Sequence, residues 1–187
     1  MDTEQKQILL KAARDAVEAV VKGESLGVIE SADPALNANC GCFVTLKTQG
    51  RLRGCIGQFT SEIPLIELVA EMTKSSVSAD PRFAHDRLTV DELNQLEIEI
   101  SVLSPLEQTS DPLSLRPGID GIYIKKGFAS GCFLPQVATE AGWSKEEFLS
   151  NCASHKAGLS PEAWKDDETE VLIFTADVFS EDDFNRP

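Results

Sequence analysis

Two pairs of strand-like segments, each joined by a very short link, most constrain how this chain folds. Residues 43–48 and 51–56 are separated only by Gln49-Gly50, and residues 121–127 lead almost directly into residues 129–134. Strands joined by so short a link pair as antiparallel hairpins, whereas parallel neighbours need a long crossover. The sequence therefore predicts antiparallel sheet and argues against a doubly wound parallel fold.

Helices are expected between these hairpins. Apolar residues at helical spacing predict helices over 3–22, ended by Gly23, and over 63–78. Capping boxes at Thr89 and Ser144 begin two shorter ones. Strands are predicted over 96–102 and 169–178. Because helices and hairpins are mixed rather than alternating regularly, the fold class is α+β.

The charge balance limits the kinds of partner. The chain has 17 Lys and Arg against 31 Asp and Glu, a net charge of −14, which argues against binding nucleic acid or an anionic membrane. Its longest apolar runs, such as Val171 to Phe174, are too short to cross a bilayer. An odd count of 5 cysteines without a secretory signal predicts reduced thiols and a cytoplasmic location.

One stretch departs from the acidic average, because no Asp or Glu lies between Asp33 and Glu62. It contains the cations Lys47, Arg51 and Arg53 and the thiols Cys40, Cys42 and Cys55. The period of two in a strand predicts Arg53 and Cys55 on one face, about 7 Å apart. A cation there would favour the thiolate, so both are candidate catalytic residues. The alternative is a buried, inert Cys55 with solvated arginines.

Other chemistry receives less support from the residues. Cys40-Gly41-Cys42 lacks the second cysteine pair and the histidines of a structural zinc site, so no metal is expected. No motif for a nucleotide or another cofactor is present, and no cofactor is expected. His85 serves as a base for Cys55 only if the two turns meet in space.

Several segments, taken together, carry a family resemblance. They are Phe43-Val44-Thr45-Leu46, Leu52-Arg53-Gly54-Cys55-Ile56-Gly57, Asp80-Pro81-Arg82-Phe83, residues 98–104, Leu134-Pro135-Gln136-Val137, Lys156-Ala157-Gly158-Leu159 and Trp164. In this order and spacing they resemble the AMMECR domain family, whose prokaryotic members are called AmmeMemoRadiSam system protein A. The resemblance covers residues 7–181 as a single domain.

The resemblance implies an α+β fold of two lobes, each an antiparallel sheet flanked by helices, with a cleft between them. The larger lobe would combine the N- and C-terminal regions, the smaller would span roughly residues 60–115, and residues 182–187 would form an acidic tail. Cys42 and Cys132 stand where the family pattern has Ala and Leu, which favours reading them as core residues.

The family has no established reaction, and its suspected site is the Leu-Arg-Gly-Cys-Ile-Gly motif. Its members here are Leu52, Arg53, Gly54, Cys55, Ile56 and Gly57, with Asp80, Arg82 and Gln136 lining the site. The prokaryotic name also implies Memo-like and radical-SAM partner proteins.

Two functions stay open at this point. One is an enzyme, or an accessory subunit of one, that acts on a small anionic or carbonyl-bearing molecule. The other is a non-catalytic binding or scaffold domain in which the motif is structural.

Overall fold

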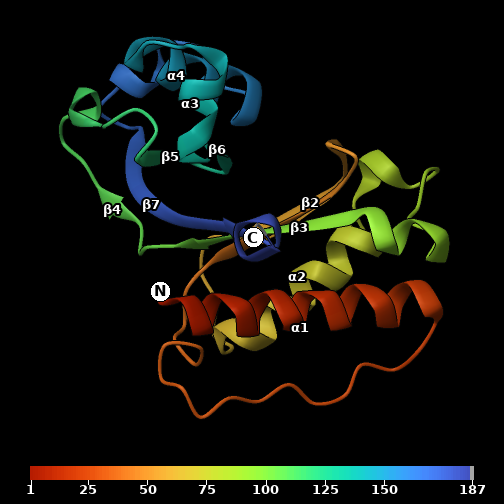
Figure 1. Ribbon diagram of the computed structural model, residues 1–187. Helices are drawn as coiled ribbons and strands as arrows, with labels where there is room; N and C mark the ends of the chain where they lie inside the picture. The colour runs from red at the N-terminus through yellow and green to blue at the C-terminus, as the bar shows by residue number, and fades with distance from the viewer. Residues whose placement is uncertain (186–187) are drawn as a thin grey trace. The chain divides into compact units, whose positions relative to one another are not determined.

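The computed structural model describes residues 1–185 of the 187, and the chain divides into two compact units (Figure 1). The larger unit combines Met1–Leu103 with the chain from Asp177 onward, and the smaller is Ser104–Ala176. The range 60–115 expected for a smaller lobe does not coincide with this unit, because much of it packs with the N-terminal helix and hairpin. Antiparallel strands and helices together confirm the α+β class.

The larger unit follows the predicted pattern closely. Its elements are α1 (Thr3–Lys22), β1 (Cys42–Thr48), β2 (Arg51–Gln58), α2 (Leu65–Ser78), the 3₁₀ helices η1 (Pro81–Phe83) and η2 (Val90–Gln95), β3 (Leu96–Leu103), the end of β7 (Glu170–Ser180) and α5 (Asp182–Asn185). The expected acidic tail thus begins as a short helix, and residues 186–187 lie outside the described part.

The first hairpin forms where the sequence predicted it. Gln49 and Gly50 have φ values of 52° and 75°, and positive φ at both central residues is what a type I′ turn requires. The strand order runs β2, β1, β3, β7, so β2 is an edge strand. The β1–β2 register shifts between Leu46 and Lys47, which marks a β-bulge in β2.

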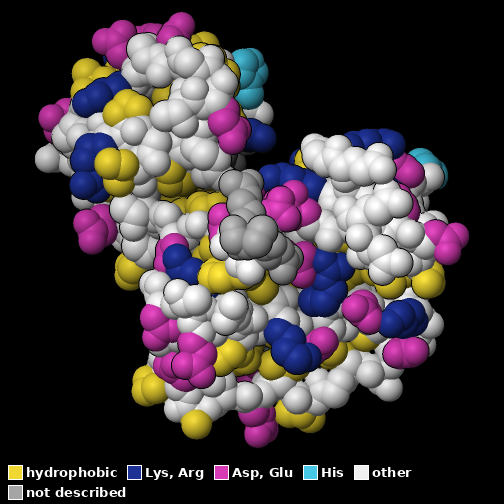
Figure 2. Space-filling view, viewed as in Figure 1, with side chains coloured by type: hydrophobic (Ala, Val, Ile, Leu, Met, Phe, Trp, Pro, Cys, Tyr) yellow, Lys and Arg dark blue, Asp and Glu magenta, His cyan; other side chains and the backbone are white. Residues whose placement is uncertain are grey.

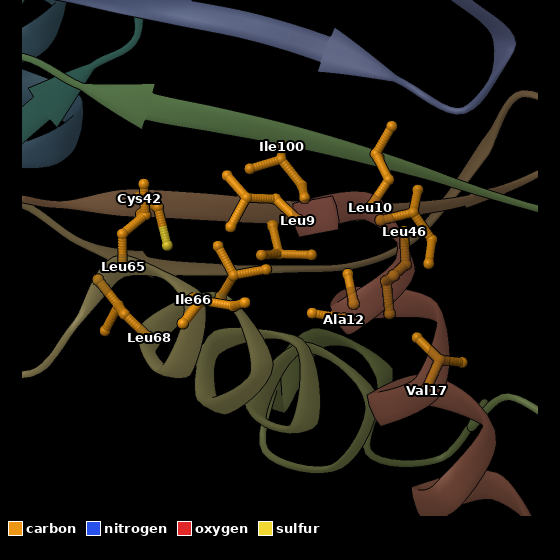
Figure 3. Packing of buried hydrophobic residues seen from close by; sticks show 14 of the residues in the cluster. Leu9, Leu10, Ala12, Val17, Cys42, Leu46, Leu65, Ile66, Leu68 and Ile100 are labelled. Atoms are coloured by element: carbon orange, nitrogen blue, oxygen red, sulfur yellow. The ribbon is translucent and has the colours of Figure 1, made fainter. Parts of the chain in front are cut away.

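The helices α1 and α2 cover one face of this sheet, and the main core lies between the helices and the sheet (Figure 3). The apolar stripe of α1 meets the inward residues of β1 and β3 and the buried face of α2. The fully buried side chains include Leu9, Leu36, Leu46, Leu65, Leu68, Ile98 and Ile100. Cys42 is also fully buried in this core, as predicted.

The smaller unit contains the second hairpin, two α-helices and three other short helical segments. Its elements are β4 (Glu107–Gln108), the 3₁₀ helix η3 (Pro112–Ser114), β5 (Asp120–Lys126), β6 (Ala129–Phe133), α3 (Pro135–Ala141), α4 (Lys145–Asn151), the π-helix η4 (Cys152–Lys156), the 3₁₀ helix η5 (Ala163–Lys165) and most of β7. β5 pairs with β6 and with β7, and β4 also pairs with β7. Phe133, Phe148 and Trp164 anchor its core.

The cations of the acid-free stretch are neutralised by acids from other parts of the chain. Lys47 pairs with Glu99 at 2.8 Å, Arg51 pairs with Asp86 at 2.7 Å, and Arg53 pairs with Glu92. On the visible face of the larger unit, Figure 2 likewise shows basic and acidic side chains interspersed. Among the described helices, none has the length and apolar character that a membrane span needs.

Candidate functional site

The backbone of Cys55 is held at the free edge of β2 by two side chains from one turn. Its N–H donates to Asp80 Oδ2 at 3.0 Å, and its carbonyl accepts from Arg82 Nη2 at 3.0 Å. An edge strand normally leaves such groups unpaired. At Cys55, Asp80 and Arg82 take the place of a neighbouring strand, which brings two of the predicted site residues to the motif.

Asp80 is built into this turn rather than exposed at its surface. It is 3% exposed and caps η1 by accepting from the backbone N–H of Arg82 at 3.1 Å. Its carboxylate also accepts from Arg82 Nε at 3.0 Å and Nη2 at 2.6 Å. The hydrogen bonds from Arg82 lower the pKa of Asp80 to about 2, against the opposing effect of burial. The carboxylate is therefore ionised at neutral pH.

The thiol of Cys55 is half-buried and has two donors beside it. Thr45 lies opposite Cys55 in the β1–β2 register, and its hydroxyl donates to Sγ at 3.3 Å. The other is the guanidinium of Arg82, whose pKa is raised first by its hydrogen bonds to Asp80 and further by the charge and hydrogen bonding of Cys55. The sulfur thus has a hydroxyl on one strand and a cation from the neighbouring turn as its polar neighbours.

Arg82 keeps hydrogen-bonding capacity for a ligand. Its side chain is 54% exposed, and Nη1 has no oxygen partner among residues 1–185. A guanidinium has five N–H donors, of which the bonds to Asp80 and to the Cys55 carbonyl use those on Nε and Nη2. The half-exposed end of Arg82 can therefore bind an anion next to the Cys55 sulfur.

The expectation that Arg53 and Cys55 share a face is wrong, and the bulge is the reason. Gly54 lies opposite Leu46 and Leu52 lies opposite Lys47, so Arg53 is the extra residue and the period of two is interrupted there. Arg53 is 5% exposed.

The contacts of Arg53 satisfy most of its guanidinium away from the thiol. Its Nη1 donates to Glu92 and, at 3.4 Å, to the hydroxyl of Thr48, which lies on the core side of β1. Its Nη2 donates to the carbonyl of Asp86 at 3.0 Å. Cys55 instead faces Thr45 on the other side of the sheet. Arg82, rather than Arg53, is the cation beside the thiol.

The two glycines of the motif allow other parts of the domain to approach the strand closely. A Cβ on Gly54 would lie 2.2 Å from the carbonyl oxygen of Ser76 in α2, and one on Gly57 would lie 2.3 Å from the ring of Phe43. Neither position has room for a side chain. At both glycines the space that a side chain would need is filled by other residues of the domain, namely Ser76 and Phe43.

Ser76 also joins α2 to the hairpin through one hydroxyl. The Ile56 N–H donates to Ser76 Oγ at 2.9 Å, and the same hydroxyl donates to the Val44 carbonyl at 2.9 Å. Val44 and Ile56 lie opposite each other, so the hydroxyl is inserted where a direct bond between strands would be. Leu52 and Ile56, the remaining motif residues, are half-buried on β2.

The other residues considered from the sequence belong to different parts of the chain. Gln136 is on α3 in the smaller unit, whereas Cys55 is on β2 in the larger one. His85 is exposed, and no described contact joins it to Cys55. Burial raises the pKa of the Cys42 thiol to about 12, and within residues 1–185 no group of three or more His, Cys, Asp or Glu side chains is arranged to hold a metal.

Sequence reasoning missed Thr45 as a neighbour of the thiol, and it missed Asp86 and Glu92 as the partners of Arg53. A regular hairpin with Gln49-Gly50 at its tip pairs Thr48 with Arg51 and therefore Val44 with Cys55. The bulge shifts that pairing by one residue to Thr45. An arginine followed by glycine in a strand signals a bulge, but it does not show which residue is the extra one.

These features define a small α+β domain with a thiol at the edge of its first hairpin, held by an Asp-Arg pair from a neighbouring turn. The AMMECR1 family model matches residues 10–179, and the chain belongs to that family. A protein of Methanothermobacter thermautotrophicus is 39% identical over 189 residues, covering 97% of each chain. Protein MJ0810 of Methanocaldococcus jannaschii is 36% identical over 186 residues, covering 95% of this chain and 90% of that protein.

The fold also matches a solved structure. The crystal structure of the uncharacterized protein PH0010 from Pyrococcus horikoshii has a TM-score of 0.86 and 37% identity, and the match covers 97% of this chain and 93% of that one. The family and the fold are therefore established, whereas the names of these relatives give no activity.

Proposed function

We propose that this AMMECR domain acts through the thiol of Cys55 on a small anionic or carbonyl-bearing molecule, as an enzyme or as the accessory subunit of one. The observation that carries the proposal is the position of the half-buried thiol between the hydroxyl of Thr45 and the guanidinium of Arg82. The cation next to the thiol is therefore Arg82, and not Arg53 as the sequence predicted.

The chemistry follows from these neighbours. The thiol of Cys55 first loses its proton to solvent, and the thiolate then adds to a carbonyl carbon to form a C–S bond. The electron pair of the C=O bond moves to oxygen, where the exposed N–H groups of Arg82 neutralise the charge. Asp80 holds Arg82 in place and stays ionised, so it positions the cation without itself exchanging a proton.

A cleft between lobes and a cytoplasmic location both stay predictions. The site rests on the larger unit alone, since Thr45, Cys55, Asp80 and Arg82 all lie there. The free thiols fit a reducing compartment.

The test is the pH dependence of thiol alkylation. We expect iodoacetamide to modify Cys55 at a lower pH than Cys40. Cys40 is a matched internal control, because it is half-buried in the same unit and burial raises its pKa. Mass spectrometry of digested protein reports both thiols in one sample.

Two variants separate the role of Arg82 from that of net charge. Arg82→Gln removes the cation beside the thiol and should raise the pH of half-maximal Cys55 alkylation. Arg51→Gln removes a cation from the same strand, one paired with Asp86, and should leave the Cys55 profile unchanged. A midpoint for Cys55 at or above about 8.5 in the unaltered protein contradicts a nucleophilic role.

A non-catalytic scaffold is the second candidate, and a specific observation favours it. Arg53, Gly54 and Gly57 all have structural tasks within the domain, so much of the motif is accounted for without a ligand. In this case the domain would present its surface to a Memo-like or radical-SAM protein. Co-purification with such a protein that survives Cys55→Ala, together with ordinary alkylation of Cys55, supports the scaffold over the enzyme.

A further inference from the structure

The connection between α1 and β1 contains an extended segment without backbone partners. Residues 25–30 form neither helix nor strand, and Figure 1 shows this connection running back along α1. Within the described chain, none of their N–H or C=O groups makes a hydrogen bond. An extended segment with free backbone groups is able to pair with an added strand.

Apolar grooves lie on both sides of this segment. The groove toward α2 has a volume of about 460 Å³ and is lined by Leu26, Ile29, Ile63 and Ala70 among others. The groove toward α1 has about 250 Å³, and its lining includes Ile8 and Ile66.

Val28 lies between the two grooves and contributes to the lining of both. Its side chain is 89% exposed, although it belongs to a residue type that is usually buried. Free backbone groups and apolar side chains thus occur together along residues 25–30 and give this surface the features of a docking site.

The charges around the grooves indicate which partner fits. Glu30 and Glu67 line the larger groove and have no ion-pair partner among the described residues, whereas Glu71 pairs with Lys74 at 2.6 Å. In the smaller groove, Lys11 and Asp15 neutralise each other at 2.5 Å. Apolar side chains and two unpaired carboxylates therefore line this surface together.

We propose that residues 25–30 bind an extended segment of a partner protein in which basic and apolar residues alternate. Its backbone would pair with the free groups of residues 25–30, its apolar side chains would enter the grooves, and its Lys or Arg residues would face Glu30 and Glu67. A second copy of this chain fits less well, because each copy carries a net charge of −14 and the same two unpaired acids.

The test uses a fluorescent ten-residue peptide that alternates Lys with Val, and a counterpart that alternates Glu with Val, at physiological salt. We expect the Lys peptide to bind the full-length protein and to slow amide exchange at residues 26–30, and the Glu peptide to do neither. Val28→Pro removes one N–H donor that has no partner in the free protein, and should weaken binding by about tenfold.

Charge variants distinguish specific docking from general attraction. Replacing Glu30 and Glu67 together by Gln should weaken peptide binding by about fivefold. The matched pair Glu107→Gln and Glu140→Gln removes the same charge from the smaller unit and should leave binding unchanged.

Three results overturn the proposal. One is equal affinity of all these variants for the Lys peptide, and another is the absence of exchange protection at residues 26–30 when the peptide is saturating. The third is dimerisation of the protein that Val28→Pro abolishes, because it would make a second copy the occupant. Thiol alkylation of Cys55 is independent of each outcome.

Discussion

Replacing Asp80 by Asn tests how much the hydrogen bonds of the Asp80 carboxylate to Arg82 and to the Cys55 backbone stabilise the fold. Asp80 is buried, and its pKa falls from 3.8 to about 2 because Arg82 donates hydrogen bonds to it. Each pKa unit corresponds to about 1.36 kcal/mol of differential interaction. The ionised carboxylate therefore contributes about 2 kcal/mol to the free energy of unfolding at pH 7.

The sign and the pH range follow from the direction of the shift. Since the folded pKa lies below the unfolded one, this stabilisation is complete well above pH 4 and is lost as the pH falls toward 2. At pH 3 about half of this stabilisation should remain. Asn resembles the protonated acid in shape and does not titrate, so the stability difference between the native protein and Asp80→Asn should shrink in the same way.

Urea unfolding followed by circular dichroism at pH 7, 5 and 3 measures this difference. Asp91→Asn serves as the control, because Asp91 is an exposed acid in the first turn of η2. We expect the control to show a small difference at every pH. A gap between native protein and Asp80→Asn that stays constant from pH 7 to pH 3 would refute the assignment of the stabilisation to the ionised carboxylate.

Further predictions concern the hairpin and the helix packed on it. Gly54→Ala should lower the free energy of unfolding, measured in urea, by about 2 kcal/mol or more, because the new Cβ meets a rigid backbone carbonyl. Gly27→Ala has open space around it and should leave the free energy of unfolding almost unchanged. Ser76→Ala should cost about 1–3 kcal/mol, because two buried backbone groups lose their shared hydroxyl. Ser78→Ala, at an exposed hydroxyl in the same helix, should stay within about 0.5 kcal/mol of the native protein, and a loss equal to that of Ser76→Ala would exclude the bridge as the cause. Arg53→Gln should destabilise the domain without changing the alkylation profile of Cys55, and a changed profile would restore Arg53 to the thiol site.

Most elements of the larger unit could be predicted because their signals are local. The helix over 3–22 has an apolar stripe and ends at Gly23, and the structure places α1 at those residues. The hairpin follows from Gln49-Gly50 and the flanking strands. The alternation over 96–102 matches β3, which extends one residue further. These patterns depend only on neighbours in the sequence.

The side-chain arrangement at the site could not be predicted in the same way. The thiol and the resembling motif both predicted a site on the strand that is β2, but the bulge at Arg53 changes which residues share a face with Cys55. The partner acids Asp86 and Glu92 come from a segment more than 30 residues away, whose path is fixed by tertiary packing. Asp80 and Arg82 were connected to the site by resemblance, and their hydrogen bonds to the Cys55 backbone required the structure.

The hydroxyl of Ser76 fixes the position of α2 on the hairpin, because it is hydrogen-bonded to both of the hairpin's strands. Sliding α2 by one turn would break both of these hydrogen bonds, and sliding β2 by one residue would break the one from Ile56. Either movement would bring Gly54 against a different part of the helix. The strand that carries Cys55 is thus a fixed support, and Asp80 and the Cys55 carbonyl hold the guanidinium of Arg82 in place next to it. A molecule bound at this edge of the sheet would therefore meet a sulfur and a cation whose separation is set by the fold.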